Sequence, residues 1–271
     1  MGRRHETISF LSDYGAVDEF AGVVRSVIRC IAPHVTVIDV SHEVPAHDVR
    51  AGSLTLVRAV QYLAPGVVLA VVDPGVGTGR RAVAVEAGED GEAVFVGPDN
   101  GLLAGAVSMV GGAGRAVELT NDAYHLPAPG PTFAGRDIFG PAAAHLCNGV
   151  ELTDLGSPID PLSLRPGLIP LSRQEGQKLE TEVLWVDRFG NIQLNVGPDD
   201  LESFDDRVTL RWSGNVRSAL RVDAYQDLGP GQLGLLVDSY GLMAVVLEQA
   251  PAADELGVKA GDALTLEPPS G

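Results

Sequence analysis

The sequence predicts an α/β protein with two domains, an N-terminal α/β domain with a largely parallel or mixed sheet and a C-terminal antiparallel β-barrel. The first half of the chain alternates short apolar runs with amphipathic stretches, a pattern typical of a sheet covered by helices. The second half has short alternating runs separated by turn residues, typical of a small antiparallel barrel or sandwich. The segment 157–172 is rich in proline, which indicates an extended linker between domains at 1–165 and 173–271.

The elements of the first domain follow from periodicity and capping signals. Apolar residues at helical spacing predict a helix over 18–31 with one buried face. Asp48 is suited to cap a second helix, and Pro65-Gly66 ends that helix before a strand of the fully buried type. In chain order the predicted elements are strand 8–11, helix 18–31, strand 35–40, helix 48–62, strands 67–72, 82–85 and 93–96, and helices 102–109 and 138–147.

The second domain is predicted from strands alone, because its apolar runs are short and alternate with polar residues. Turn residues separate each run from the next, so we expect neighbouring strands to pair antiparallel. The predicted strands are 182–186, 192–196, 208–212, 220–222, 233–237, 242–247 and 263–266.

Composition excludes several classes of function. The chain has 271 residues, 45% of them hydrophobic, and a formal net charge of −17. This charge repels nucleic acids and anionic lipid surfaces, and no basic run offsets it locally. No apolar stretch approaches the roughly 18 residues of a membrane span, and no signal sequence is apparent. Cys30 and Cys147 lie in apolar helical patterns, so we expect two buried free thiols and a cytoplasmic protein.

Asp73 is the first candidate for chemistry, because ligands of open α/β sheets bind beyond the carboxyl ends of strands. It follows the buried strand 67–72, and Arg80 lies seven residues later in the same glycine-rich loop. A solvated surface hairpin is the alternative interpretation of this loop. The loop is not a phosphate cradle, since no Gly-Lys-Ser/Thr follows it.

Four other loops carry carboxylates with both a functional and a structural interpretation. Asp13 follows the first strand and is suited to bind a vicinal diol such as a ribose, whereas Asp18 is equally explained as a charge at a helix start. Asp99 fits a turn with a helix cap, Asp137 fits a helix cap, and Asp187 fits a hairpin turn. The histidines and cysteines lack metal-ligand spacing and no Gly-x-Ser-x-Gly motif occurs, so we expect no metal centre and no serine-hydrolase site. The residues alone favour a carboxylate and arginine site of unspecified substrate.

Taken together, the motifs of nearly the whole chain resemble the S-adenosylmethionine hydroxide adenosyltransferases, relatives of the S-adenosylmethionine-dependent halogenases. Any one of these motifs is weak, but six in order at matching spacing are specific. The six are Phe10-Leu11-Ser12-Asp13-Tyr14-Gly15 with Asp18, Val72-Asp73-Pro74-Gly75-Val76-Gly77-Thr78 with Arg80, Gly97-Pro98-Asp99-Asn100-Gly101-Leu102-Leu103, Gly135-Arg136-Asp137-Ile138-Phe139, Asp187-Arg188-Phe189-Gly190-Asn191, and Asp238-Ser239-Tyr240-Gly241.

The resemblance implies a homotrimer that hydrolyses S-adenosylmethionine to adenosine and methionine without a cofactor. By position, Asp13 matches the ribose ligand, and active sites are implied where one subunit's first domain meets a neighbour's second domain. The other implied substrate-binding positions are Asp18, Asp187 and Ser239 for the methionine moiety, Asn191 and Tyr225 for adenine, and His47 and Tyr240 where halogenases carry Trp and Arg.

The resemblance also implies a catalytic Asp, Arg and His, and this chain matches only the first two, as Asp73 and Arg80. Ala134 occupies the position of the family histidine, and it cannot exchange a proton. Three explanations stay open: a deliberate substitution that traps ligand, a natural variant with weak activity, or a binding protein for S-adenosylmethionine or adenosine. We favour the first, because a degenerate enzyme would be expected to lose other site residues too. Halogenase activity is a further alternative, disfavoured because Asp73 places a carboxylate where a halide must bind.

Overall fold

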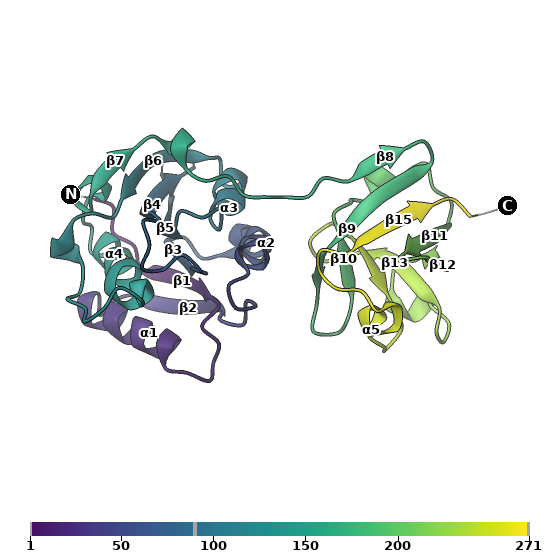
Figure 1. The fold of residues 1–271 in the computed structure, drawn as a ribbon, viewed down its shortest axis with the longest axis horizontal. Helices are drawn as coiled ribbons and strands as arrows, with labels where there is room; N and C mark the ends of the chain where they lie inside the picture. Colours follow the sequence, from purple (N-terminus) through teal and green to yellow (C-terminus); the bar gives the residue numbers. More distant parts are fainter. Residues whose placement is uncertain (1, 89–90, 270–271) are drawn as a thin grey trace. The chain divides into compact units, whose positions relative to one another are not determined.

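The computed structural model describes residues 2–88 and 91–269 and divides the chain into two compact units (Figure 1). Unit 1 is Met1–Leu168 and unit 2 is Ile169–Gly271. Unit 1 contains a sheet covered by helices and unit 2 contains a barrel, so the predicted fold class is confirmed.

The sheet of unit 1 has seven strands in the order β2-β1-β3-β5-β4-β6-β7. The first four strands in this order are parallel neighbours, and the remaining pairings are antiparallel, which makes the sheet mixed. Its strands are β1 (Thr7–Ser12), β2 (Thr36–Ser41), β3 (Val67–Val71), β4 (Ala82–Ala87), β5 (Ala93–Pro98), β6 (Ala113–Glu118) and β7 (Ser157–Ile159).

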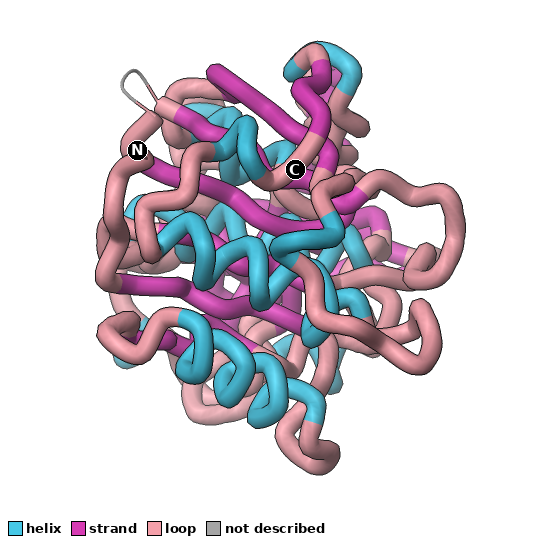
Figure 2. Tube along the Cα trace, turned by 90° about the vertical axis from the view of Figure 1, so that its left-hand side faces the viewer, coloured by secondary structure: helices cyan, strands magenta, loops and turns pink. Residues whose placement is uncertain are grey.

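Successive side chains of β3 point to opposite faces of the sheet and belong to two separate hydrophobic cores. Val67, Leu69 and Val71 pack with α1 (Phe20–Ile31) and α4 (Gly140–Cys147), which contact each other. Val68 and Ala70 pack on the other face with α2 (Val49–Ala59) and α3 (Ala104–Met109) (Figure 1). Every residue of β3 is buried, as the continuous apolar run predicts. In the view of Figure 2 the helices lie over the strands of the sheet.

The helix boundaries of unit 1 agree with the sequence signals to within a few residues. The Asp48 carboxylate accepts a hydrogen bond from the Ala51 amide at 2.8 Å, so the predicted cap of α2 is confirmed. Helix α1 begins at Phe20 and not at Asp18, and the side chain at its N-cap, Glu19, makes no capping hydrogen bond. Helix α3 begins at Ala104, after a turn at Gly101, and a π-helix at Gly135–Phe139 precedes α4.

One further expectation for unit 1 is wrong. Cys147 is a buried free thiol, but Cys30 is an exposed one, because it lies on the outward face of α1. The segment 157–172, expected to be an extended linker, contains the division between the two units after Leu168, and it begins with strand β7, which pairs with β6. Pro158 is tolerated there because β7 is an edge strand, where a missing backbone N–H faces no partner.

Unit 2 is a mixed β-barrel that closes through the pairing of β9 with β10. Only one of its pairings, between β12 and β13, is parallel; this pair departs from the expected antiparallel pattern because a crossing loop joins the two strands. The elements are β8 (Arg173–Glu175), β9 (Lys178–Val186), β10 (Ile192–Leu194), β11 (Arg207–Trp212), β12 (Asn215–Arg221), β13 (Leu233–Val237), β14 (Met243–Val246), α5 (Ala252–Leu256) and β15 (Ala263–Glu267). Strand β8 and helix α5 are not anticipated by the periodicity.

Candidate active site

Parallel pairing of β1 with β3 brings two candidate carboxylates to the same edge of the sheet. Ser12 at the end of β1 is in register with Val71 at the end of β3. The next residue after β1, Asp13, donates its backbone N–H to the Val71 carbonyl at 3.4 Å. Asp73 follows two residues after Val71, and the two carboxylates repel each other electrostatically. This edge is therefore the candidate site of unit 1.

Asp73 and Arg80 form a buried ion pair within one loop. The Arg80 guanidinium donates to Asp73 Oδ2, and their side chains are only 12% and 6% exposed. Gly77, with φ of 76°, allows the loop to turn back so that the two side chains meet. The guanidinium also lies over the Phe139 ring, 5.2 Å from its centroid. These contacts rule out the solvated hairpin as the structure of this loop.

The Asp73–Arg80 pair has polar atoms that are not used in its ion pair. Asp73 Oδ1 and Arg80 Nε are both buried and have no hydrogen-bond partner among the described residues. Burial raises the pKa of the Asp73 carboxyl above its usual value, and Arg80 opposes this shift. A buried carboxylate with one unused oxygen is suited to orient a small polar molecule such as water.

The Asp13 carboxylate is oriented by the loop that follows β2. Asp13 Oδ2 accepts a hydrogen bond from the backbone N–H of His47 at 2.8 Å. His47 adopts φ of 67°, a left-handed conformation that is uncommon for residues other than glycine. Such strain is held in place by surrounding contacts and is concentrated at functional sites. The backbone of His47 thus reaches the candidate site, and Asp13 Oδ1 remains available for a ligand.

Tyr14 is a site residue that the sequence did not single out. Its ring packs against Phe20 and Phe133 at centroid distances of 5.7 Å each. The backbone N–H of Gly135 donates to its hydroxyl, while burial and the carboxylates of Asp13 and Asp73 raise its pKa. Gly135 itself gives the signal that could have identified this contact, because a side chain there would overlap the Tyr14 hydroxyl.

Ala134 lines a cavity of about 360 Å³ in the same unit. The cavity is also lined by His125, whose Nδ1 lies 3.3 Å from a carboxylate oxygen of Asp122. Ala134 is itself 6% exposed and packs in the hydrophobic core beside Phe139. Asp18 is the one predicted residue of this unit that lies apart: it is exposed ahead of α1, and no hydrogen bond or ion pair joins it to another described residue.

Five predicted binding residues of unit 2 share one cavity of about 350 Å³. They come from the loops after β9 and β13 and from the loop between β12 and β13. The set comprises Asp187, Asn191, Tyr225, Ser239 and Tyr240. Trp185, Gln193, Asp223 and Asp238 line the same cavity and were not predicted as site residues.

Two aspartates organise the turns around this cavity of unit 2. Asp187 accepts from the Asn191 amide N–H and side-chain Nδ2 at 2.9 and 2.8 Å, which fixes the orientation of the Asn191 side chain. Asp238 accepts from the Tyr240 amide at 2.8 Å and from the Gln193 side chain. Burial and, to a smaller extent, the two aspartates raise the pKa of the Tyr225 hydroxyl. The cavity combines aromatic faces with negative charge, a combination that favours a cationic or neutral aromatic ligand.

Two motifs of unit 1 have structural roles instead. Asp99 is not a helix cap: it accepts from Arg81 Nε at 2.9 Å and from the Arg165 amide at 2.8 Å. Asp137 lies within the π-helix and is paired with Arg136, so it does not cap the helix either. Asp137 also lines the cavity beside Ala134, and Asp99 lines a small cavity with Leu164 and Arg165.

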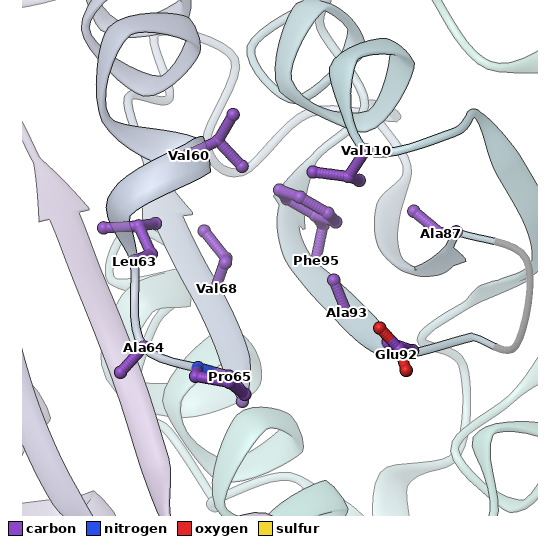
Figure 3. Close-up of a pocket in the computed structure, with 12 residues that line it drawn as sticks. Val60, Leu63, Ala64, Pro65, Val68, Ala87, Glu92, Ala93, Phe95 and Val110 are labelled. Carbon is purple, nitrogen blue, oxygen red and sulfur yellow. The ribbon is translucent and has the colours of Figure 1, made fainter.

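A further cavity of unit 1, of about 390 Å³, lies away from these residues. Pro65, Val68, Ala93 and Phe95 line it near the amino ends of β3 and β5, opposite to the end that carries Asp73 (Figure 3). Its lining is mostly apolar, and Glu92 is the acidic residue among the described residues that line it. No histidine, serine, cysteine or arginine stands beside this carboxylate among the described lining residues.

Within residues 2–88 and 91–269, no group of three or more His, Cys, Asp or Glu side chains is arranged to hold a metal ion. No helix in the described part of the chain is long and apolar enough to cross a membrane.

The fold and the site together define the class of protein. A mixed sheet covered by helices carries a carboxylate–arginine pair at its edge, and a β-barrel unit follows it in the chain. Residues 8–156 match the SAM hydroxide adenosyltransferase N-terminal domain, and residues 181–265 match the C-terminal domain of the same family. The chain belongs to the SAM hydroxide adenosyltransferase family, which confirms the resemblance drawn from the six motifs.

Individual relatives cover almost the full chain. The (R)-S-adenosyl-L-methionine hydrolase of Salinispora tropica is 45% identical and covers 95% of this chain and 96% of that protein. The hydrolase of the same name from Thermus thermophilus is 38% identical, with 94% and 96% covered. A fluorinase from an Actinoplanes species is 27% identical, with 96% of each chain covered. The crystal structure of an uncharacterized conserved protein from Thermotoga maritima is 35% identical, with a TM-score of 0.86 over 96% of this chain and 99% of that one.

Proposed function

We propose that this protein hydrolyses S-adenosylmethionine to adenosine and methionine. The observation that carries the proposal is the buried Asp73–Arg80 pair, which leaves Asp73 Oδ1 without a partner at the sheet edge beside Asp13. Two relatives that share 38% and 45% of their residues with the chain bear the name of this activity. We further propose the (R) sulfonium epimer as the substrate, since their names specify it.

The proposed reaction is an in-line displacement at the ribose 5′ carbon. A water oxygen forms a bond to this carbon while the carbon–sulfur bond breaks, and its electron pair goes to sulfur. The sulfonium becomes the neutral thioether of methionine, so the leaving group requires no acid, and the water gives up one proton to solvent. The catalytic requirement is a positioned water with hydroxide character. Asp73 accepts a hydrogen bond from this water, and the Arg80 charge stabilises the developing hydroxide.

We assign substrate binding to the two clusters described above. Asp13 Oδ1 is proposed to accept from the ribose hydroxyls, while Oδ2 stays bound to the His47 amide. The unit 2 cavity, with Asp187, Asn191, Tyr225, Ser239 and Tyr240, is proposed to bind the adenine and methionine moieties. His47 and Asp18 remain proposed substrate contacts. A homotrimer is likewise proposed, and light scattering of the purified protein tests it.

Ala134 is proposed to limit the rate of this reaction. The methyl group can neither bind nor exchange a proton, so the water is activated by Asp73 and Arg80 alone. The cavity of about 360 Å³ beside Ala134 leaves room for an imidazole at this position. We therefore expect the chain to turn over slowly.

The deciding experiment traces the oxygen atom of the attacking water into the product. Incubation with each sulfonium epimer in H₂¹⁸O, followed by liquid chromatography and mass spectrometry, should give methionine and adenosine with one ¹⁸O at the 5′ position. Asp73→Asn should abolish product. Asp99→Asn is the matched control, because Asp99 is another buried carboxylate paired with an arginine in the same unit, and this variant should retain turnover below its melting temperature.

Two results would contradict the proposal. Formation of 5′-chloro-5′-deoxyadenosine in the presence of chloride would identify a halogenase. Binding of S-adenosylmethionine without any turnover, both in this chain and after Ala134→His, would identify a binding protein.

A further inference from the structure

A chain of polar side chains runs from the candidate site through His42. The Ser12 hydroxyl lies 2.7 Å from His42 Nδ1, and His42 Nε2 lies 3.0 Å from Asp39 Oδ1. The other carboxylate oxygen of Asp39 is paired with Arg25 from α1. Although Ser, His and Asp in this order suggest a nucleophile, Ser12 is 0% exposed, so its hydroxyl cannot attack a substrate. The chain has to serve another purpose.

The hydrogen-bonding capacities fix a direction along this chain. A carboxylate only accepts, so Asp39 accepts from His42 Nε2–H. In the neutral imidazole Nδ1 is then the acceptor, and the Ser12 hydroxyl donates to it. The Ser12 oxygen is left to accept from the Tyr14 amide, which lies 3.3 Å away. His42 therefore acts on the backbone of the loop that follows β1.

Three hydrogen bonds join the segment 42–47 to Asp13 and its neighbours in the loop after β1. His42 binds Ser12 through its ring and accepts from the Gly15 amide through its carbonyl at 2.7 Å. His47 donates its amide to the Asp13 carboxylate at 2.8 Å. The His42 ring is itself held edge-on against Phe10 at 4.6 Å, and its side chain is only 11% exposed. Ser12 and Gly15, which lie on either side of Asp13 in the chain, are thus both bound to His42.

We propose that His42 is a positioning residue for nucleoside recognition, acting through Ser12 and Gly15 to aim the Asp13 carboxylate at the ribose diol. The inference rests on the proposed function, because the ribose is the group that Asp13 is proposed to bind. His42 would thus contribute to substrate recognition without contacting the substrate itself. Replacing the His42 side chain leaves the Asp13 carboxylate and the backbone bond to Gly15 in place but removes the contact with Ser12 beside Asp13.

Equilibrium binding of adenosine tests this role without requiring turnover. Isothermal titration calorimetry is carried out on the full chain and on His42→Ala and Ser12→Ala, with adenosine and with 2′,3′-dideoxyadenosine. We expect each variant to weaken adenosine binding about tenfold, which corresponds to about 1.4 kcal/mol. Binding of the dideoxy compound, which has no hydroxyl pair for Asp13, should change less than about twofold. His34→Ala, an exposed histidine outside the network, is the control and should alter neither ligand.

The outcomes separate the two proposals. If adenosine fails to bind the unsubstituted chain, the inference fails, whereas the proposed function is decided separately by the ¹⁸O-labelled product. If adenosine binds but both variants retain its affinity, or lose affinity for both nucleosides equally, His42 is structural only and the positioning role is refuted. Ser12→Ala removes a single hydroxyl group, so it provides the test even if His42→Ala does not fold.

Discussion

Replacing Gly135 with alanine should destabilise unit 1 through a single contact. The added methyl group would lie 2.1 Å from the Tyr14 hydroxyl oxygen and 3.1 Å from the ring carbon that carries it. The backbone of Gly135 does not have the positive φ that disfavours alanine, so the cost arises from the contact alone. Tyr14 cannot move freely, because its ring packs against Phe20, Phe133 and, at 6.4 Å, Phe10.

The size of the effect follows from two contributions. Overpacking a buried site costs about 1–3 kcal/mol, and loss of the hydrogen bond from the Gly135 amide to the Tyr14 hydroxyl costs about 1 kcal/mol. For a unit of this length each kcal/mol lowers the melting temperature by about 2–4 °C. We therefore expect a decrease of about 4–16 °C in the melting temperature, followed by circular dichroism. Gly22→Ala, in an open position of α1, is the control and should stabilise by about 0.5–1 kcal/mol.

A second substitution tests the cause. Tyr14→Phe removes the oxygen that the new methyl group would meet, so the double variant of Gly135→Ala with Tyr14→Phe should be more stable than Gly135→Ala alone. If the double variant is no more stable, the contact with Tyr14 is not the source of the loss, and our description of this part of the site is wrong.

Three further predictions concern the charged groups and Ala134. The folded state raises the pKa of Asp73. The proton bound to Asp73 therefore stabilises the fold in full below the unfolded pKa of about 3.9, and this stabilisation is lost as the pH rises through the folded pKa. The melting temperature of Asp73→Asn should therefore increase relative to that of the unsubstituted chain as the pH rises through this window. A difference in melting temperature that does not change with pH would contradict the raised pKa of Asp73. Asp99→Ala removes the carboxylate that neutralises the mostly buried Arg81 and should lower the free energy of unfolding by about 3 kcal/mol in urea denaturation, whereas a loss below about 1 kcal/mol would contradict the role of this pair. Ala134→His should raise hydrolysis by about 10²-fold or more in a product assay, and an unchanged rate would refute a catalytic role for this position.

Local patterns predicted the elements whose environment is encoded within a few neighbouring residues. The continuous apolar run of β3 and the cap at Asp48 are examples, since burial on both faces and a capping hydrogen bond each leave a short-range signal. The parallel pairing of β12 with β13 left no such signal, because it depends on contacts formed only when the barrel closes.

The same distinction applies to the candidate site. Asp73 and Arg80 could be singled out because both lie in one loop after a buried strand. Tyr14 and His42 could not, since each acts through a partner far along the chain: Gly135 for the tyrosine and Ser12, 30 residues away, for the histidine. Motif resemblance supplied the unit 2 residues, which periodicity alone would have assigned to turns.

The parallel pair β12–β13 has a consequence for how this family can change its ligands. Parallel neighbours cannot be joined by a tight hairpin, so the connection 222–232 must travel back along the strand before β13 begins. Tyr225 and Asp223, which line the unit 2 cavity, sit on this connection. Its length is not fixed by strand register, so residues can be inserted, deleted or exchanged there while the barrel keeps its pairing. Changes in this loop can therefore alter ligand specificity while the barrel stays the same.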